Sequence, residues 1–212
     1  MHARFKLRAG AVALAWFALP VALSAQKTAQ LDRIWNGVQQ AQARTATACG
    51  TVVETRSSPL MTRPLVLHGR FCAEGAVRFW LEYLPPHALT VRFDTDDLQV
   101  TGGDGATEVL KIGGGVRRAQ STFSRASSLD GLKKDFTITA EENERVYALR
   151  FVPRTANYRR RLKLLAVQLD KRTFLPRSIE VDGKSGVNSV FAIDIASTNR
   201  KLPGGIFEEK KK

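Results

Sequence analysis

The chain has 212 residues, of which 43% are hydrophobic, and its formal charge at neutral pH is +13. This is enough for one domain with a sizeable core, and no linker, repeat or low-complexity block divides the chain. A basic excess favours an acidic partner or an anionic membrane surface, although lysines and arginines scattered for solubility would give the same count. A nucleic-acid partner is not expected, because no helix-turn-helix, RNP or zinc-finger pattern is present.

Residues 1–25 have the composition of a secretory leader. Arg4, Lys6 and Arg8 precede an uncharged run from Ala9 to about Leu23, which ends in small residues at Ser24 and Ala25. This order predicts a cleaved signal peptide, and the run of about 15 residues is short for a membrane anchor. The leader carries three basic and no acidic residues, so cleavage lowers the charge from +13 to +10. We therefore expect an exported protein with one domain, residues 26–212.

Two helices are predicted, one at the start of the mature chain and one near its middle. Residues 27–44 place an apolar stripe at helical spacing, formed by Leu31, Ile34, Trp35, Val38 and Ala41. A second, shorter helix is predicted between Ser121 and Lys134 from the spacing of Phe123, Ala126, Leu129 and Leu132. Each stripe needs an apolar partner, most simply one face of a sheet.

From Thr47 onward the hydrophobic period is two for most of the chain, which predicts strands. The candidate strands are residues 46–55, 65–73, 76–84, 88–93, 97–101, 107–112, 135–140, 146–152, 161–169, 177–182 and 187–195. Nearly all are joined by short connections with turn signals, so consecutive antiparallel pairing is expected. The fold class is therefore mainly β with short helices.

One face of this sheet is predicted to be apolar on strand after strand. The candidate lining residues are Phe71, Phe79, Leu81, Tyr83, Val91, Phe93, Leu149, Phe151, Phe191 and Ile193. Two short helices cannot easily cover about eleven strands to the density of a core, which favours a concave, partly unfilled interior. A flattened sandwich that fills its own core is the alternative.

The only two cysteines, Cys49 and Cys72, are predicted to form a disulfide. If the first hairpin turns between Ser57 and Pro64, paired residues have numbers that add up to about 121, and the two cysteines meet this condition. Exported proteins encounter an oxidising compartment. Two free buried thiols are the alternative, and the lack of a Cys-x-x-Cys motif argues against a redox pair.

Catalytic and metal-binding patterns are hard to find. Outside the leader only His68 and His87 remain, and the chain has no Gly-x-Ser-x-Gly, His-Glu-x-x-His or P-loop motif. We therefore expect a binding protein that is not an enzyme and has no metal or cofactor. A hydrolase of envelope polymers stays open as a further alternative.

One group of basic residues, Arg159, Arg160, Arg161 and Lys163, stands at the start of a predicted strand. Such a group can meet lipid headgroups or an acidic membrane partner. It can equally serve to keep a loop soluble, so both interpretations stay open.

The order of features along the mature chain resembles that of the LolA-like outer-membrane lipoprotein carrier family. After the leader and the amphipathic helix come Gly69-Arg70-Phe71, Arg78-Phe79-Trp80 before Pro85-Pro86, Asp135-Phe136-Thr137-Ile138, Phe151-Val152-Pro153, Pro176-Arg177-Ser178-Ile179, Phe191 to Ile195, Asn199 and Leu202-Pro203-Gly204-Gly205-Ile206-Phe207. The chain departs from the family pattern in the cysteine pair, in lacking an Asp-Gly turn after Asp94, and in having Ala73-Glu74-Gly75-Ala76 where the family has a basic Arg-Pro segment.

The resemblance implies an unclosed antiparallel β-barrel of about eleven strands, with helices covering its concave apolar face. It implies a monomeric periplasmic carrier whose cavity binds acyl chains of lipoproteins or another lipid and moves them toward the outer membrane. An inner-membrane delivering complex and an outer-membrane acceptor would be its partners. The alternative is an envelope sensor or protein-interaction module of the same fold, without stable lipid cargo.

Overall fold

The computed structural model describes residues 19–75, 78–94, 97–111 and 128–207. Its strands are β1 (Thr47–Ser57), β2 (Leu65–Glu74), β3 (Arg78–Tyr83), β4 (Leu89–Asp94), β5 (Asp97–Gly102), β6 (Thr107–Lys111), β7 (Phe136–Glu142), β8 (Val146–Pro153), β9 (Leu162–Asp170), β10 (Pro176–Gly183) and β11 (Asn188–Thr198). Its helices are α1 (Leu19–Arg44), α3 (Leu129–Asp135) and α4 (Ala156–Arg159). All eleven predicted strands are present, with bounds that differ by at most three residues.

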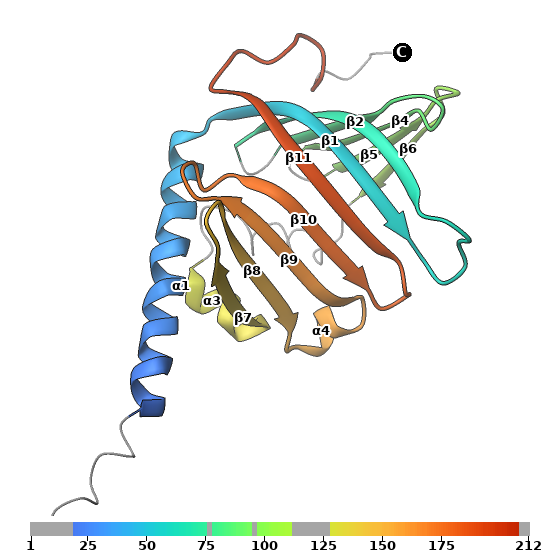
Figure 1. The fold of residues 1–212 in the computed structure, drawn as a ribbon. Helices are drawn as coiled ribbons and strands as arrows, with labels where there is room; N and C mark the ends of the chain where they lie inside the picture. Colours follow the sequence, from blue (N-terminus) through green and yellow to red (C-terminus); the bar gives the residue numbers. More distant parts are fainter. Residues whose placement is uncertain (1–18, 76–77, 95–96, 112–127, 208–212) are drawn as a thin grey trace, which may run out of the picture.

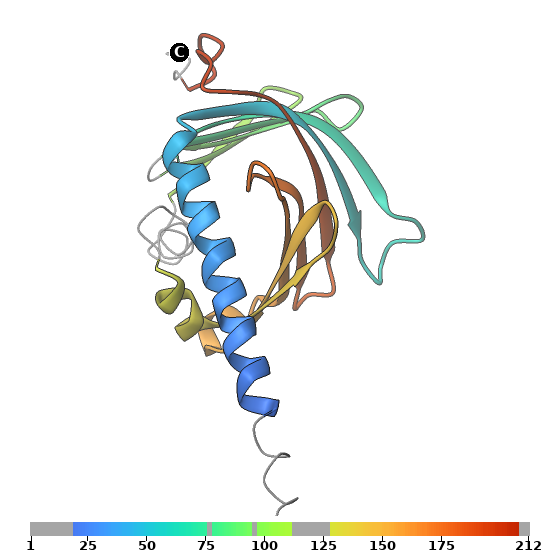
Figure 2. The ribbon, with the colours of Figure 1, turned by 60° about the vertical axis from the view of Figure 1, so that its left-hand side comes forward.

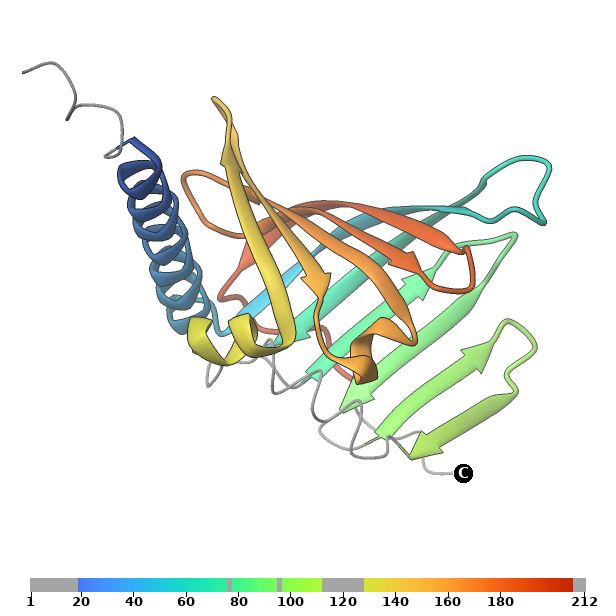
Figure 3. The same cartoon turned by 90° about the horizontal axis from the view of Figure 1, so that it is seen from below.

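The strands form one antiparallel sheet in the order β6-β5-β4-β3-β2-β1-β11-β10-β9-β8-β7. The first and last strands of the chain, β1 and β11, therefore lie side by side in the middle of the sheet (Figure 1). Figure 3 shows the strands following one another across the sheet from β7 (yellow) to β6 (green). Within the described part of the chain the two edge strands, β6 and β7, do not pair, so the sheet is an unclosed barrel, as predicted.

The helices differ from the sequence prediction in three places. The first helix ends at Arg44 as predicted but begins at Leu19, so it includes the last residues of the predicted leader. The second helix, α3, begins after its N-cap Ser128 and contains the predicted positions Leu129 and Leu132. The other two predicted positions, Phe123 and Ala126, lie outside the described residues. The single turn α4 was not predicted, because four residues are too few to show a helical period. Residues 1–18 of the leader also lie outside the described residues, and cleavage stays a prediction.

Helices α1 and α3 cover the β7–β9 part of the sheet. Ile34 of α1, Leu132 of α3 and Phe136 of β7 are each at most 1% exposed at the centre of this cluster. Glu142, at the end of β7, forms an ion pair with Arg33 of α1 (2.9 Å) and another with Lys171, which directly follows β9. Figure 2 shows α1 beside α3 and the β7 edge. No helix in the described part of the chain combines the length and apolar character that a membrane crossing requires.

Asn199, just after β11, fixes the point where α1 gives way to β1. Its side-chain oxygen accepts the N–H of Ala46 at 2.7 Å, and its side-chain nitrogen donates to the carbonyl of Arg44 at 2.8 Å. The Arg44 carbonyl is one of the last carbonyls of α1, which have no partner within the helix, and Ala46 directly precedes β1. One side chain thereby ties the start of the sheet to its last strand.

The central pairing of β1 with β11 requires a glycine at position 50. The register shifts between Cys49 and Gly50, and a Cβ at Gly50 would lie 1.9 Å from the carbonyl oxygen of Asp194. No side chain can occupy that space, because the obstacle is backbone. The two strands can therefore approach each other here only because residue 50 has no side chain.

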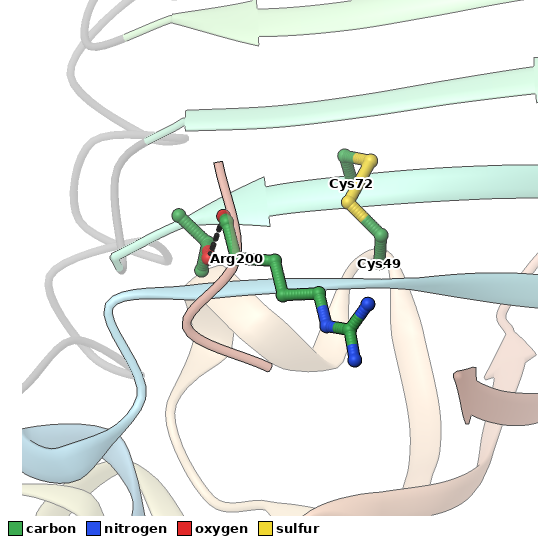
Figure 4. The surroundings of a disulfide bond; sticks show 4 residues. Cys49, Cys72 and Arg200 are labelled. Atoms are coloured by element: carbon green, nitrogen blue, oxygen red, sulfur yellow. Dashed lines mark hydrogen bonds between the residues drawn. A yellow bond between two sulfur atoms is a disulfide. The ribbon is translucent and has the colours of Figure 1, made fainter. Parts of the chain in front are cut away.

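The predicted disulfide is present. Cys49 and Cys72 are directly opposed in the β1–β2 register and their sulfurs are joined, with Cα atoms 4.2 Å apart (Figure 4). Phe71 and Ala73, which flank Cys72, point into the cavity described below, so the disulfide lies on the other face of the sheet. The segment after β11 lies near this face, because Thr47 donates its hydroxyl to the carbonyl of Arg200 at 2.7 Å.

Replacing both cysteines by serine is expected to lower the free energy of unfolding by about 3 kcal/mol, because the bond closes a loop between residues 23 positions apart. Urea unfolding of the double variant measures the loss. The reduced wild-type protein is the matched control and should show the same loss. An unchanged unfolding midpoint in both samples would contradict the expectation.

Candidate functional site

A cavity of about 820 Å³ lies against the apolar face of β1 to β5, β10 and β11. Ligand pockets for small molecules typically have volumes of about 300–1,000 Å³, so this one is large. Eight of the ten predicted lining residues border it: Phe71, Phe79, Leu81, Tyr83, Val91, Phe93, Phe191 and Ile193. At the end near the C-terminus of α1 the wall includes Gln42 and Thr45.

Strand alternation brings these side chains together. Register places Phe71 opposite Leu81 and Leu81 opposite Val91, so three neighbouring strands project apolar side chains to one face at the same height. Phe79 lies opposite Phe93 in the next row, and its ring stacks on Phe71 at a centroid distance of 6.2 Å. Phe79 nevertheless stays 37% exposed, as expected for a wall that faces open space rather than a packed core.

The prediction that Leu149 and Phe151 line the same cavity is wrong. Leu149 is on the predicted face, because the register runs from Glu54 through Phe191, Ile179 and Val167 to Leu149. Both β8 residues, however, are only 2% exposed and belong to the cluster beneath α1 and α3. The two helices fill one end of the apolar face and leave the cavity at the other.

The cavity wall also contains a buried carboxylate that the sequence analysis missed. Glu54 of β1 is 0% exposed and is on the same face as Val52 and Arg56. It accepts a hydrogen bond from the Tyr83 hydroxyl and another from Nε of Arg56 at 2.8 Å. A buried carboxylate requires such partners, because an unpaired one costs several kcal/mol.

These contacts keep Glu54 ionised. Burial would raise the pKa of Glu54, but hydrogen bonds from Tyr83, Arg56 and Ser189, together with the charge of Arg56, outweigh burial and hold the pKa below its ordinary value. Burial and the hydrogen bond to Glu54 raise the pKa of Tyr83 above its ordinary value. At neutral pH the cluster therefore contains a carboxylate, a guanidinium and a neutral phenol.

The basic group lies apart from the cavity. Arg159, Arg160 and Arg161 are exposed between β8 and β9, at and after α4, and Lys163 follows at the start of β9. Lys163 is 3.5 Å from Asp182 of the neighbouring strand β10. Contact of this group with a membrane or an acidic partner stays a prediction. Among the residues that the structure describes, no three His, Cys, Asp or Glu side chains are grouped as metal ligands.

No family model and no curated protein matches the sequence. Among solved structures, MucB is 16% identical with a TM-score of 0.50, over 82% of this chain and 61% of MucB. A LolA superfamily protein from Nitrosomonas europaea is 13% identical with a TM-score of 0.45, over 84% and 97% of the two chains. The Pseudomonas aeruginosa MucA/MucB complex matches at 16% identity and a TM-score of 0.48, over 80% of this chain and 58% of that one.

This chain thus spans about three fifths of the length of MucB. A structural likeness at 16% sequence identity establishes the fold and leaves the activity open. The unclosed eleven-stranded sheet, with helices on its apolar face, agrees with the architecture that the order of sequence features implied. The chain therefore shares the fold of MucB, an unclosed antiparallel barrel with helices on its apolar face.

Proposed function

We propose that the protein is a periplasmic carrier that binds acyl chains of lipoproteins, or another lipid, in its cavity and moves them toward the outer membrane. The observation that carries the proposal is the apolar cavity of about 820 Å³ on a sheet face whose other end is closed by α1 and α3. Each methylene that leaves water for such a wall contributes about 0.8 kcal/mol. A chain of more than ten carbons would therefore bind without any specific polar contact.

The remaining parts of the proposal follow from transport between two membranes. The predicted leader would bring the protein into the periplasm, where an inner-membrane complex would deliver the ligand and an outer-membrane acceptor would receive it. Transfer at each membrane requires that the ligand leave the cavity again. Reversible burial of apolar surface allows this release, whereas a covalent bond to the ligand would hinder it. The proposal therefore includes no catalytic role.

The alternative is an envelope sensor or interaction module of the same fold. MucB has been solved in complex with MucA, so at least one protein of similar structure binds another protein. Such a module would use its surface or its sheet edges and would carry no stable lipid. The two functions differ in whether the cavity is occupied in the cell.

Native mass spectrometry of protein purified from its own periplasm without detergent tests this difference. A carrier is expected to show an added mass that matches a lipid or an acylated peptide and disappears after organic extraction. The extracted protein should then bind a fluorescent fatty-acyl probe. A bare polypeptide mass together with no probe binding would contradict the carrier and favour the interaction module.

A further inference from the structure

Arg56 places one positive charge at one end of the cavity. The bordering part of β1 runs from Ala48 to Arg56, which is about 26 Å at ~3.3 Å per residue. An acyl chain spans about 15 Å, half of the ~30 Å hydrocarbon core of a bilayer. The wall is therefore longer than one acyl chain. The opposite end, at Gln42, Thr45 and Ala48, offers only neutral groups.

The contacts of Arg56 leave part of its guanidinium for a ligand. Glu54 accepts the Nε hydrogen at 2.8 Å, whereas the Nη hydrogens are the donors that bind carboxylate or phosphate oxygens in pairs. The Arg56 side chain is 40% exposed, while the Glu54 side chain is only 1% exposed. Among the described residues, Glu54 is the only acidic group within ion-pair distance of Arg56. A ligand in the cavity would therefore reach the Arg56 guanidinium more readily than the Glu54 carboxylate.

The cluster is not needed for apolar packing. A buried ion pair is often no more stabilising than hydrophobic residues of similar volume, and other side chains of the cavity wall, such as Val52, Leu81 and Ile193, are hydrophobic. The pair does provide position. Glu54 accepts the Nε hydrogen of Arg56, and Tyr83 of β3, two strands away from β1, donates its hydroxyl to Glu54. A guanidinium held in place at an apolar wall binds anions more strongly than one in water.

We infer that the Arg56 end of the cavity binds the anionic headgroup, a carboxylate or a phosphate, of a lipid whose acyl chain lies along Phe71, Phe79 and Leu81. The inference rests on the proposed function and narrows the ligand to an acidic amphiphile. Arg56 contacts the ligand, and Glu54 and Tyr83 are positioning residues. The shape of the site orients the lipid, with its head at Arg56 and its tail toward Gln42.

Three probes with one dansyl-labelled acyl chain test the inference: the fatty acid, its methyl ester, and the phosphate monoester of the corresponding alcohol. The wild-type protein is expected to bind one or both anionic probes at least tenfold more tightly than the ester, since a hydrogen bond to a charged group contributes about 1.5–3 kcal/mol, which is tenfold or more. Equal affinity for all three would overturn the inference and leave the carrier proposal standing. No binding of any probe would overturn both.

Variants then assign the preference to Arg56. Arg56→Gln is expected to lose the tenfold preference, so that it binds the anionic probes no more tightly than the ester, and Arg56→Lys should keep part of the preference. Arg63→Gln removes the same charge from an exposed position in the β1–β2 hairpin and should keep the full preference. Loss of preference in both glutamine variants would indicate a general effect of net charge and overturn the site. If Arg56→Gln fails to fold, two results still test the site: the preference of the wild-type protein for the anionic probes, and the partial preference expected of Arg56→Lys.

Discussion

Glutamate in place of Phe151 is expected to abolish folding, whereas glutamate in place of Phe79 is expected to preserve the fold and abolish acyl-chain binding. Phe151 is 2% exposed beneath α1 and α3. Losing a buried phenylalanine costs about 3–5 kcal/mol, and burying an unpaired carboxylate adds several more, together comparable to the ~5–15 kcal/mol stability of a whole domain. Phe79 is 37% exposed, so water can reach a carboxylate at this position. The free energy of unfolding should therefore fall by only about 1 kcal/mol.

Far-UV circular dichroism melts and titration with a fluorescent fatty-acyl probe measure the two effects. Val152→Glu is the matched control, because Val152 is next to Phe151 but 47% exposed on the opposite face. It should keep both the melting temperature and probe affinity. Unfolding of the Phe79 variant would show that the cavity behaves as a packed core. Undiminished probe binding by that variant would place the ligand elsewhere.

Glu54→Ala is expected to lower the free energy of unfolding by about 3 kcal/mol, because it leaves the Arg56 charge and the Tyr83 hydroxyl without their common partner. Tyr83→Phe should cost about 1 kcal/mol, since it removes one of several donors to the carboxylate. Glu54→Leu combined with Arg56→Leu should recover most of the loss, because hydrophobic residues suit the remaining wall. A single Glu54→Ala variant as stable as the wild type would contradict this account of the cluster.

The same carboxylate gives a pH signature. The pKa of Glu54 is lower in the folded protein than its ordinary value of about 4.3, so its stabilisation is complete above that pH and declines as the pH falls through the lower folded-state value. Urea unfolding at a series of pH values should therefore show that the wild type has a higher free energy of unfolding than Glu54→Gln at neutral pH, and that this difference shrinks below about pH 4. An advantage that persists unchanged to pH 2 would show that ionisation of Glu54 is not the cause.

The strands and the first hairpin were predictable because their signals are local. Alternation in segments such as residues 76–84 specifies a strand and its two faces, and the hairpin between Ser57 and Pro64 sets the register that opposes Cys49 to Cys72. Both depend only on neighbours in sequence. The overall architecture then followed from the order of these segments.

The division of the apolar face could not be predicted, because it depends on where α1 packs. Leu149 and Phe191 have the same pattern in sequence and lie on the same face, yet α1 covers the first and the cavity reaches the second. Glu54 was missed for a related reason. A glutamate in a strand ordinarily faces water, and its partner Tyr83 is 29 positions away on another strand. The alternation of Val52, Glu54 and Arg56 on one side of β1 was the only local signal.

The central position of β1 beside β11 has a consequence for the order in which the sheet, and with it the cavity, can form. In the described part of the chain every other pairing joins consecutive strands, whereas this one joins residues such as Val52 and Ile193, about 140 positions apart. The entropy cost of closing its loop is the largest among these strand pairings, so β1–β6 and β7–β11 can each form as a local meander before they meet. The cavity takes its wall from both meanders and exists only after they join. A bound lipid would therefore hold together the least local junction of the chain, and loading would stabilise the assembled state over its separated halves.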